Sequence, residues 1–213
     1  SLKQKKTKTI GVIIPEIVHH FFAKVISGIE EVANSKEYNV IIGVSNESLA
    51  KEAINMEMLI DGSIDDFIVS LSKETLLKQD YHHLEATQNR NIPIVMFDRV
   101  VDDIDCDKII INDREAGRMA VQKLIDIGCK KILLLTTMDY LHIGRMRTEG
   151  YRDALLSNGM AYDEELVVKI GELGDSDEEQ RNLEHRINLV FEKHPDIDGI
   201  FGVNEIYAVT ALN

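Results

Sequence analysis

The sequence predicts an α/β protein with two Rossmann-like lobes, each built on a parallel sheet. Short runs of β-branched and apolar residues recur at intervals of about 25 to 30 residues, and a helical stretch follows each run. This is the spacing that right-handed βαβ crossovers require. A chain of 213 residues is also long enough for two modest α/β lobes.

Eight short runs are predicted to be the strands of these sheets. The runs in the first half of the chain are nearly continuous in apolar residues, which is typical of strands that are covered on both faces. The predicted strands are residues 9–14, 40–44, 67–71 and 93–97 in the first half, and residues 108–111, 132–136, 167–170 and 199–203 in the second half.

Three stripes of apolar residues at helical spacing predict amphipathic helices that cover the sheets. The polar stretch 174–180 is predicted to be an exposed lead-in to the third helix. Asn112 and Glu115 have the pattern of a capping box, so a new βα unit is predicted near residue 112, and we place the lobe boundary there. The three stripes are Phe22, Val25, Ile26, Ile29, Val32 and Ala33; Gly117, Ala120, Val121, Leu124 and Ile125; and Leu183, Ile187, Val190 and Phe191.

Two short segments of similar sequence bear on whether the lobes are related. Residues 64–68 and 197–201 both place an acidic turn directly before an apolar strand. Two lobes of related sequence would each contain such a segment. Aspartate is also common in turns before the strands of any α/β protein, so both interpretations stay open.

The formal net charge of −13 and the pI near 5.0 oppose binding of this part of the chain to nucleic acid. An acidic surface forgoes the counterion release that drives contact with phosphate backbones.

Cys106 and Cys129 have neither the spacing of a metal site nor the number of a disulfide framework, which predicts a reducing compartment, the cytoplasm. The sequence has no apolar run of about 20 residues, so no membrane span is predicted.

The sequence lacks the common motifs of nucleotide-dependent and hydrolytic enzymes. The dinucleotide fingerprint, the Walker phosphate loop and the serine nucleophile elbow are all absent. Pro15 follows the first predicted strand and supplies no N–H to a phosphate cradle. Acidic clusters at residues 102–107 and 175–179 do not match a calcium loop and are predicted to be solvated. We therefore predict no enzyme activity, no cofactor and no metal.

Two pairs of adjacent histidines are poor candidates for a metal site. Neighbouring residues on a helix diverge, whereas a zinc pair is expected four residues apart. We predict that His82 and His83 lie on a solvated helix face. His19 and His20 follow the first strand, and ligands of open α/β sheets bind at the carboxyl ends of strands, so these two are candidates for ligand contact.

Segments along the whole chain resemble, in order and spacing, the effector-binding core of LacI/GalR transcription regulators. The most specific segment is Arg147-Thr-Glu-Gly-Tyr-Arg-Asp-Ala-Leu155, which is similar to the family's Arg-x-x-Gly-Tyr/Phe signature. The resemblance covers essentially all of residues 9–213. The other segments are Thr9-Ile-Gly-Val-Ile-Ile-Pro15, His20-Phe-Phe-Ala23, Gly28-Ile-Glu-Glu31, Phe97-Asp-Arg99, Ile111-Asn-Asp-Arg-Glu-Ala-Gly117, Gly128-Cys-Lys-Lys-Ile132 and Phe201-Gly-Val-Asn-Glu205.

The resemblance implies a periplasmic-binding-protein-like fold of type I. Residues 9–111 are then the N-terminal lobe and residues 112–213 the C-terminal lobe, which is expected to be incomplete because the family core continues beyond the position of Asn213. Residues 1–8 are rich in lysine and resemble the linker from a missing DNA-binding headpiece. A merely solvated lysine-rich end is the alternative.

The resemblance also implies a ligand site between the lobes, and residue chemistry supports particular contacts there. Arg147 offers several fixed donors for vicinal hydroxyls or a carboxylate, with a surface salt bridge to Glu149 or Glu205 as the alternative. Phe21 can present an aromatic face to a sugar ring, whereas helical spacing assigns Phe22 to the buried stripe. The predicted ligand-binding residues are His20, Phe21, Phe22, Asp98, Asp113, Arg147, Asn204 and Glu205.

Four of these candidates have an alternative structural role. Asn204 and Glu205 stand at a predicted helix start, where they bind ligand hydroxyls or only cap the helix. Asp98 and Asp113 stand at the ends of predicted strands and either line the site or cap a helix. The family usually has Asp where Glu205 stands, so the ligand is expected to differ from the best-known sugars.

The sequence therefore predicts the small-molecule-sensing and dimerisation core of a LacI-type regulator, with a sugar or sugar derivative as effector. A headpiece outside this chain would bind operator DNA, and the protein would form a homodimer. Ligand binding is expected to close the lobes and to change the spacing of the headpieces. The alternative is an extracytoplasmic sugar-binding protein of a transport system, which shares the fold.

Overall fold

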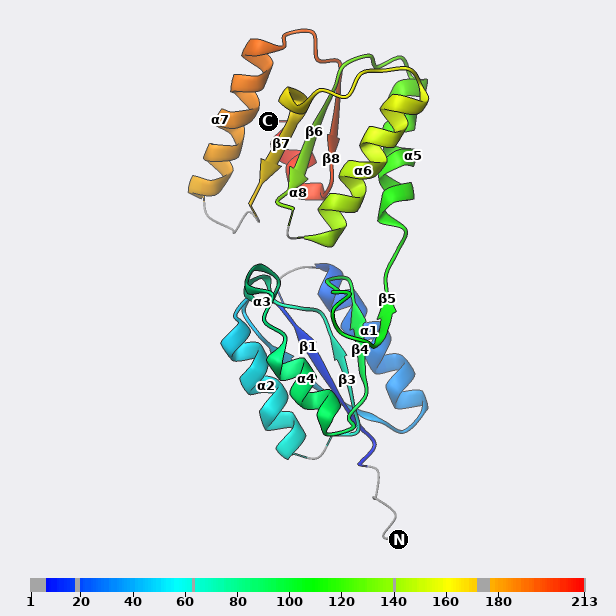
Figure 1. Ribbon diagram of the computed structural model, residues 1–213, viewed down its shortest axis with the longest axis vertical. Coiled ribbons are helices and arrows are strands. Elements are labelled where there is room, and N and C mark those ends of the chain that lie inside the picture. Colours follow the sequence, from blue (N-terminus) through cyan, green and yellow to red (C-terminus); the bar gives the residue numbers. More distant parts are fainter. Residues whose placement is uncertain (1–6, 18–19, 63, 140, 172–176, 213) are drawn as a thin grey trace. The chain divides into compact units, whose positions relative to one another are not determined.

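Two parallel sheets organise the chain (Figure 1). The computed structural model describes residues 7–17, 20–62, 64–139, 141–171 and 177–212, with side chains 177–180 left out. The chain divides into unit 1, Ser1–Ile111, and unit 2, Asn112–Asn213. Every strand pair in both sheets is parallel, which confirms the prediction from the βαβ spacing.

Unit 1 has three layers, with its five-stranded sheet in the middle. Helix α1 lies on one face of the sheet, and helices α2 and α4 lie on the other (Figure 1). The strand order is β2-β1-β3-β4-β5. The strands are β1 Thr9–Ile14, β2 Asn39–Val44, β3 Asp66–Val69, β4 Ile94–Phe97 and β5 Asp107–Ile109; the helices are α1 His20–Ser35, α2 Leu49–Asp61, α3 Lys73–Lys78 and α4 His82–Asn89.

Helix α1 presents most of its predicted apolar stripe to the sheet. Phe22 and Ala33 are buried, and Val25, Ile26 and Ile29 are partly buried. The prediction is wrong for Val32, which is 57% exposed. At about 100° per residue, Val32 lies roughly 80° around the helix from Phe22, at the margin of the stripe.

Strand β2 is not covered on both faces, contrary to the prediction from its apolar composition. Ile41 and Ile42 are 45% and 42% exposed, because β2 is an edge strand whose only neighbour in the described sheet is β1. Strand β5 forms the other edge, and Ile109 is exposed there. The apolar run alone could not distinguish an edge strand from a central one.

Unit 2 is built on a three-stranded sheet of order β7-β6-β8. All six residues of β6 are buried, as expected of a central strand that helices cover on both faces. Helices α5 and α6 lie on one side and α7 on the other (Figure 1). The strands are β6 Ile132–Thr137, β7 Val167–Ile170 and β8 Gly199–Gly202; the helices are α5 Asp113–Asp126, α6 His142–Ser157, η1 Glu164–Leu166, α7 Asp177–Lys193 and α8 Glu205–Thr210.

The helix stripes predicted for unit 2 are largely confirmed. Leu183 and Ile187 of α7 are buried in the core, and Val121 of α5 is fully buried. Ala120 is exposed, so the prediction is wrong at that position, which lies at the margin of its stripe. Of the predicted lead-in to α7, residues 174–176 lie outside the described part, and residues 177–180 form the first turn of the helix instead.

The two acidic turns before strands make the same contact in both units. The Asp65 carboxylate accepts hydrogen bonds from the N–H groups of Thr7 (2.9 Å) and Lys8 (2.8 Å), just before β1. The Asp198 carboxylate accepts from the N–H groups of the two lysines just before β6, at 2.8 to 2.9 Å. Each contact ties the start of one strand to the start of its neighbour in the sheet, β3 to β1 in unit 1 and β8 to β6 in unit 2. Together with the matching orders β2-β1-β3 and β7-β6-β8, they favour two related halves.

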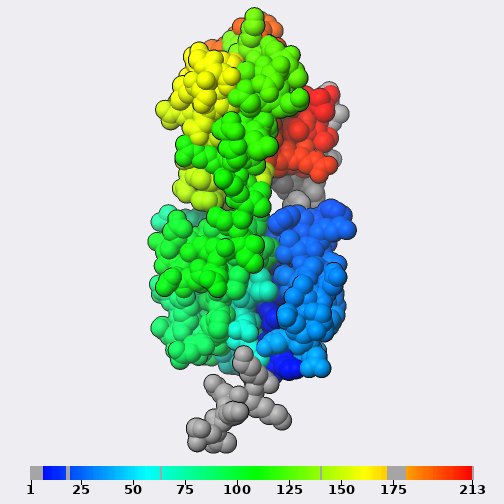
Figure 2. Space-filling model, turned by 90° about the vertical axis from the view of Figure 1, so that its right-hand side faces the viewer, coloured from blue at the N-terminus to red at the C-terminus, as the bar shows by residue number. Residues whose placement is uncertain are grey.

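Two glycines allow the backbones of α5 and α6 to touch, and the helices lie against each other in the space-filling view (Figure 2). A Cβ on Gly150 would lie 2.1 Å from the carbonyl oxygen of Arg114. A Cβ on Gly117 would lie 2.6 Å from the carbonyl oxygen of Arg147. Backbone atoms cannot move aside as a flexible side chain can, so this crossing fixes where the N-terminal half of α6 lies.

We predict that Gly150→Ala destabilises unit 2 by about 3 kcal/mol, because the added methyl overlaps the backbone of α5. Gly28→Ala in α1 is the matched control, because no atom lies within 4 Å of its added Cβ. It should leave stability unchanged or raise it by about 0.5–1 kcal/mol. Urea unfolding followed by circular dichroism measures both, and equal midpoints for the two variants would contradict this packing.

Candidate functional site

Arg147 is held at the carboxyl end of the unit 2 sheet by two contacts. Its Nε donates to Oδ1 of Asp113 at 2.8 Å, and its Nη1 donates to the carbonyl oxygen of Val203. Asp113 is the first residue of α5, and Val203 directly follows β8. The guanidinium therefore joins a helix start to a strand end.

The ion pair is protected from water on one side only. The Asp113 side chain is 5% exposed, whereas that of Arg147 is 26% exposed. Within the described residues, Nη2 of Arg147 has no hydrogen-bond partner. Arg147 does not pair with Glu149 or Glu205, and Glu149 instead lies 3.5 Å from Arg114. The structure thus pairs two predicted site residues and leaves donors of the guanidinium available.

The start of α8 lies beside the same strand end. Asn204 is the N-cap of α8, and its Oδ1 accepts from the N–H of Tyr207 at 3.0 Å. Glu205 is the first residue of the helix and is exposed. Asn204 therefore caps α8. Among the described residues, neither Nδ2 of Asn204 nor the Glu205 carboxylate has a hydrogen-bond partner.

In unit 1, the first residues of α1 also lie near the carboxyl edge of their sheet. His20 and Phe21 are exposed, and Phe21 is 50% exposed. Phe22 is buried against Phe97, with ring centroids 6.2 Å apart in an edge-to-face arrangement, so it belongs to the core as its spacing predicted. His19 lies outside the described residues.

Asp113 does not cap a helix in this structure, and Asp98 lies in a turn after its strand. Asp98 follows β4 with a left-handed backbone, φ 59°, and its N–H donates to the carbonyl oxygen of Ile109. Asp113 is the first helical residue of α5, and Asn112 caps that helix by accepting from the N–H of Glu115. The capping alternative is therefore wrong for Asp113. The predicted capping residue Asn112 is confirmed.

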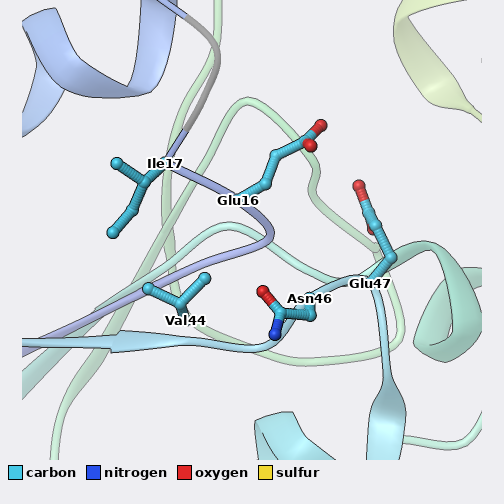
Figure 3. Close-up of a pocket in the computed structure, with 5 residues that line it drawn as sticks. All are labelled: Glu16, Ile17, Val44, Asn46 and Glu47. Atoms are coloured by element: carbon cyan, nitrogen blue, oxygen red, sulfur yellow. The ribbon is translucent and has the colours of Figure 1, made fainter. Parts of the chain in front are cut away.

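A cavity of about 450 Å³ lies at the carboxyl edge of the unit 1 sheet (Figure 3). None of its lining residues was among the predicted site residues. They follow β1, or they end or follow β2, so the rule that ligands bind at carboxyl ends of parallel strands would have found them. The lining residues are Glu16, Ile17, Val44, Asn46 and Glu47.

Glu47 is held firmly at the wall of this cavity. Its two carboxylate oxygens accept from Nη1 of Arg99 at 2.7 and 2.8 Å, and Oε2 also accepts from the N–H of Lys73 at 2.6 Å. The Arg99 side chain is 10% exposed. Asn46 and Glu47 both have positive φ, 47° and 60°, which turns the chain sharply after β2.

A second glutamate of unit 1 is completely buried. Oε1 of Glu52 accepts from the Thr75 hydroxyl at 2.7 Å and lies 2.8 Å from Nε2 of His83, and Oε2 accepts from the N–H of Ser72 at 2.5 Å. The prediction that His82 and His83 lie on a solvated helix face is therefore wrong for His83, which is 5% exposed. It is confirmed for His82, which is exposed. The partner of His83 lies 31 residues earlier, where no local pattern reveals it.

We predict that Glu52→Leu destabilises unit 1 by about 3–5 kcal/mol, because it leaves three buried donors without an acceptor. Glu57→Leu on the same helix is the control, since Glu57 is exposed and should change stability by less than about 0.5 kcal/mol. Thermal unfolding compares the two variants. Equal stability of both would show that the buried glutamate network contributes nothing.

The described residues contain no group of three histidine, cysteine, aspartate or glutamate side chains placed to hold a metal ion. In the described part of the chain, no helix combines the length and apolarity needed to cross a bilayer.

Comparisons with known proteins agree on one family. The model for periplasmic binding proteins and the sugar binding domain of the LacI family matches residues 7–213. Catabolite control protein A of Priestia megaterium is 28% identical over 169 residues, which cover 79% of this chain and 49% of that protein. The chain thus spans about half the length of this curated relative.

Solved structures give the same result. Transcription regulator CcpA of Lactococcus lactis superposes with a TM-score of 0.79 at 26% identity, covering 96% of this chain and 70% of that one. A periplasmic binding protein/LacI transcriptional regulator from Alkaliphilus metalliredigens, complexed with D-xylulofuranose, has a TM-score of 0.73 at 25% identity, covering 97% and 71%. This chain therefore belongs to the family of periplasmic binding proteins and sugar binding domains of the LacI family.

Proposed function

We propose that this core binds a sugar or a similar hydroxyl-rich small molecule and thereby controls a transcription regulator. The observation that carries the proposal is the guanidinium of Arg147, which is held in one orientation at the carboxyl end of the unit 2 sheet. Asp113 and Val203 fix its orientation, and Nη2 stays available to a ligand. A planar fork of fixed donors is suited to vicinal hydroxyls.

Neighbouring residues supply the complementary acceptors. The exposed carboxylate of Glu205 and the amide of Asn204 lie at the start of α8, which follows the same strand end as Val203. Carboxylates accept hydrogen bonds from hydroxyl groups, and an amide both donates and accepts. In unit 1, exposed Phe21 offers an aromatic face, which sugars use as a stacking surface.

The relatives support a sugar over other small molecules and a regulator over a transport receptor. The Alkaliphilus relative is complexed with D-xylulofuranose, and the Lactococcus lactis relative is a transcription regulator. We propose that DNA is bound by a segment outside this chain, because the net charge of −13 opposes contact with phosphates. We further propose a homodimer as the working form, and a cytoplasmic location in keeping with the two free cysteines.

We predict that one or more members of a panel of aldoses, ketoses and disaccharides raise the melting temperature by several degrees at saturating concentration. A ligand that binds only the folded state at 100 times its Kd stabilises it by about 2.7 kcal/mol. Differential scanning fluorimetry measures the shift. A panel without a single saturable increase would count against sugar binding.

For the sugar that binds, we predict that Arg147→Lys weakens affinity at least about tenfold, because an ammonium cannot keep both contacts and still present a planar fork. Arg152→Lys is the matched control on the same helix. Arg152 is exposed and lies over the ring of Tyr162, 5.3 Å from its centroid. Isothermal titration calorimetry compares them, and equal affinities would remove Arg147 from the site.

A further inference from the structure

The edge of the unit 1 sheet at β2 carries apolar side chains that no described part of the chain covers. Ile41 and Ile42 are 45% and 42% exposed, and Ile54 and Met58 of the neighbouring helix α2 are 54% and 67% exposed. We call these four residues the β2 edge surface. We propose that two copies of this chain associate through it. The inference rests on the homodimer of the proposed function and deepens it, because it names the surface that the two copies share.

The side chains of this surface lie next to one another. A Cβ on Gly43 would lie 3.1 Å from Cβ of Asn55, so Gly43 is on the face of the sheet that α2 covers. Ile41, two residues earlier on β2, points to the same face. Helix α2 returns along the sheet, so Met58, one turn after Asn55, comes level with Ile41. Ile54 is one turn before Met58 and extends the apolar surface along the helix.

The two edges of the unit 1 sheet differ in how they are protected. Strand β5 has three residues, and Asp107 and Lys108 place charges on it. A short edge strand with charged side chains resists pairing with another chain. Strand β2 has six residues, no charge and an unbroken register with β1. A long apolar edge of this kind is a liability in a monomer, so we expect it to be covered in the working form.

A second copy of the chain is the partner that this surface fits. An uncharged apolar strip needs an uncharged apolar counterpart, and another copy presents the identical strip across a twofold axis. With a formal net charge of −13, two copies repel each other at long range, and an uncharged patch is where they can approach. Salt screens this repulsion, so dimerisation strengthens as salt is added. Binding of an oppositely charged partner would weaken instead.

The dimensions of the edge suit a specific dimer of modest affinity. Six residues of extended chain are about 20 Å long, and a strand with a helix packed on each face is about 30 Å thick. Helices α1 and α2 lie on opposite faces of the sheet and both contact β2. The edge therefore offers about 600 Å² per copy, or about 1,200 Å² in total, which is the lower end of specific interfaces. We expect a dissociation constant in the micromolar range.

Sedimentation velocity of the chain over about 1–500 µM, a range that brackets micromolar affinity, measures the association. The series is run at low and at high sodium chloride concentration. We expect an equilibrium between monomer and dimer that shifts toward the dimer at high salt. A chain that stays monomeric under all these conditions, or a dimer that dissociates as salt is added, would overturn the inference.

Hydrogen–deuterium exchange locates the contact. The amides of β2 and α2 should exchange more slowly at a concentration where the dimer predominates than at one where the monomer does. The amides of β5, at the other edge of the same sheet, should exchange equally at both concentrations. Slowing at β5 with no change at β2 would place the contact elsewhere and contradict the proposal.

A matched set of lysine variants assigns the contact to particular side chains. Met58→Lys should raise the dissociation constant at least about tenfold, because it forces an unpaired charge into an apolar contact. Met58 is 67% exposed on a helix, so the variant folds. Ile41→Lys should have the same effect. Ile109→Lys is the control, because Ile109 is 66% exposed on the other edge strand and the charge change is identical. If Met58→Lys and Ile109→Lys dimerise equally well, the β2 edge surface is not the interface.

Failure of this inference and failure of the proposed function give different results. A chain that dimerises through β2 but whose melting temperature no sugar raises would keep this inference and count against sugar binding. A chain that a sugar stabilises but that stays monomeric would keep sugar binding and remove the proposed interface.

Discussion

The ion pair between Asp113 and Arg147 is the interaction on which the site of unit 2 depends. Asp113 is nearly completely buried, and a buried carboxylate without a partner would destabilise the fold. Arg147 supplies that partner and in turn is oriented by it. Nη1 of Arg147 donates to the carbonyl oxygen of Val203, so contacts with two elements fix the plane of the guanidinium. One pair therefore stabilises unit 2 and presents donors at a strand end.

The rest of the Arg-x-x-Gly-Tyr signature supports this pair in physical terms. Gly150 lets the backbone of α6 approach that of α5, which brings Arg147 within reach of Asp113. Tyr151 is fully buried, and its hydroxyl donates to the carbonyl oxygen of Ile132 at 2.8 Å, which anchors α6 on β6. Burial raises the pKa of Tyr151, so the hydroxyl remains a neutral donor. Each residue of the signature thus contributes to one geometry.

Much of this could be predicted from the sequence, and the failures have a common cause. Periodicity predicts all eight strands and the buried position of Phe22, because local spacing determines them. It does not predict that β2 is an edge strand, since strand order depends on pairings between distant segments. For the same reason the burial of His83 on Glu52 and the salt bridge of Arg99 with Glu47 were missed. The ligand-binding roles of the eight predicted site residues stay predictions.

The claim that Asp113 acts on the ligand only through Arg147 can be tested by a double-mutant cycle. Isothermal titration calorimetry with a stabilising sugar would compare Asp113→Asn, Arg147→Lys and the double variant. We expect the two losses of binding free energy to be strongly non-additive, so that the double variant binds about as weakly as Arg147→Lys alone. Independent losses that simply add in the double variant would contradict it, because the two residues would then contact the ligand separately.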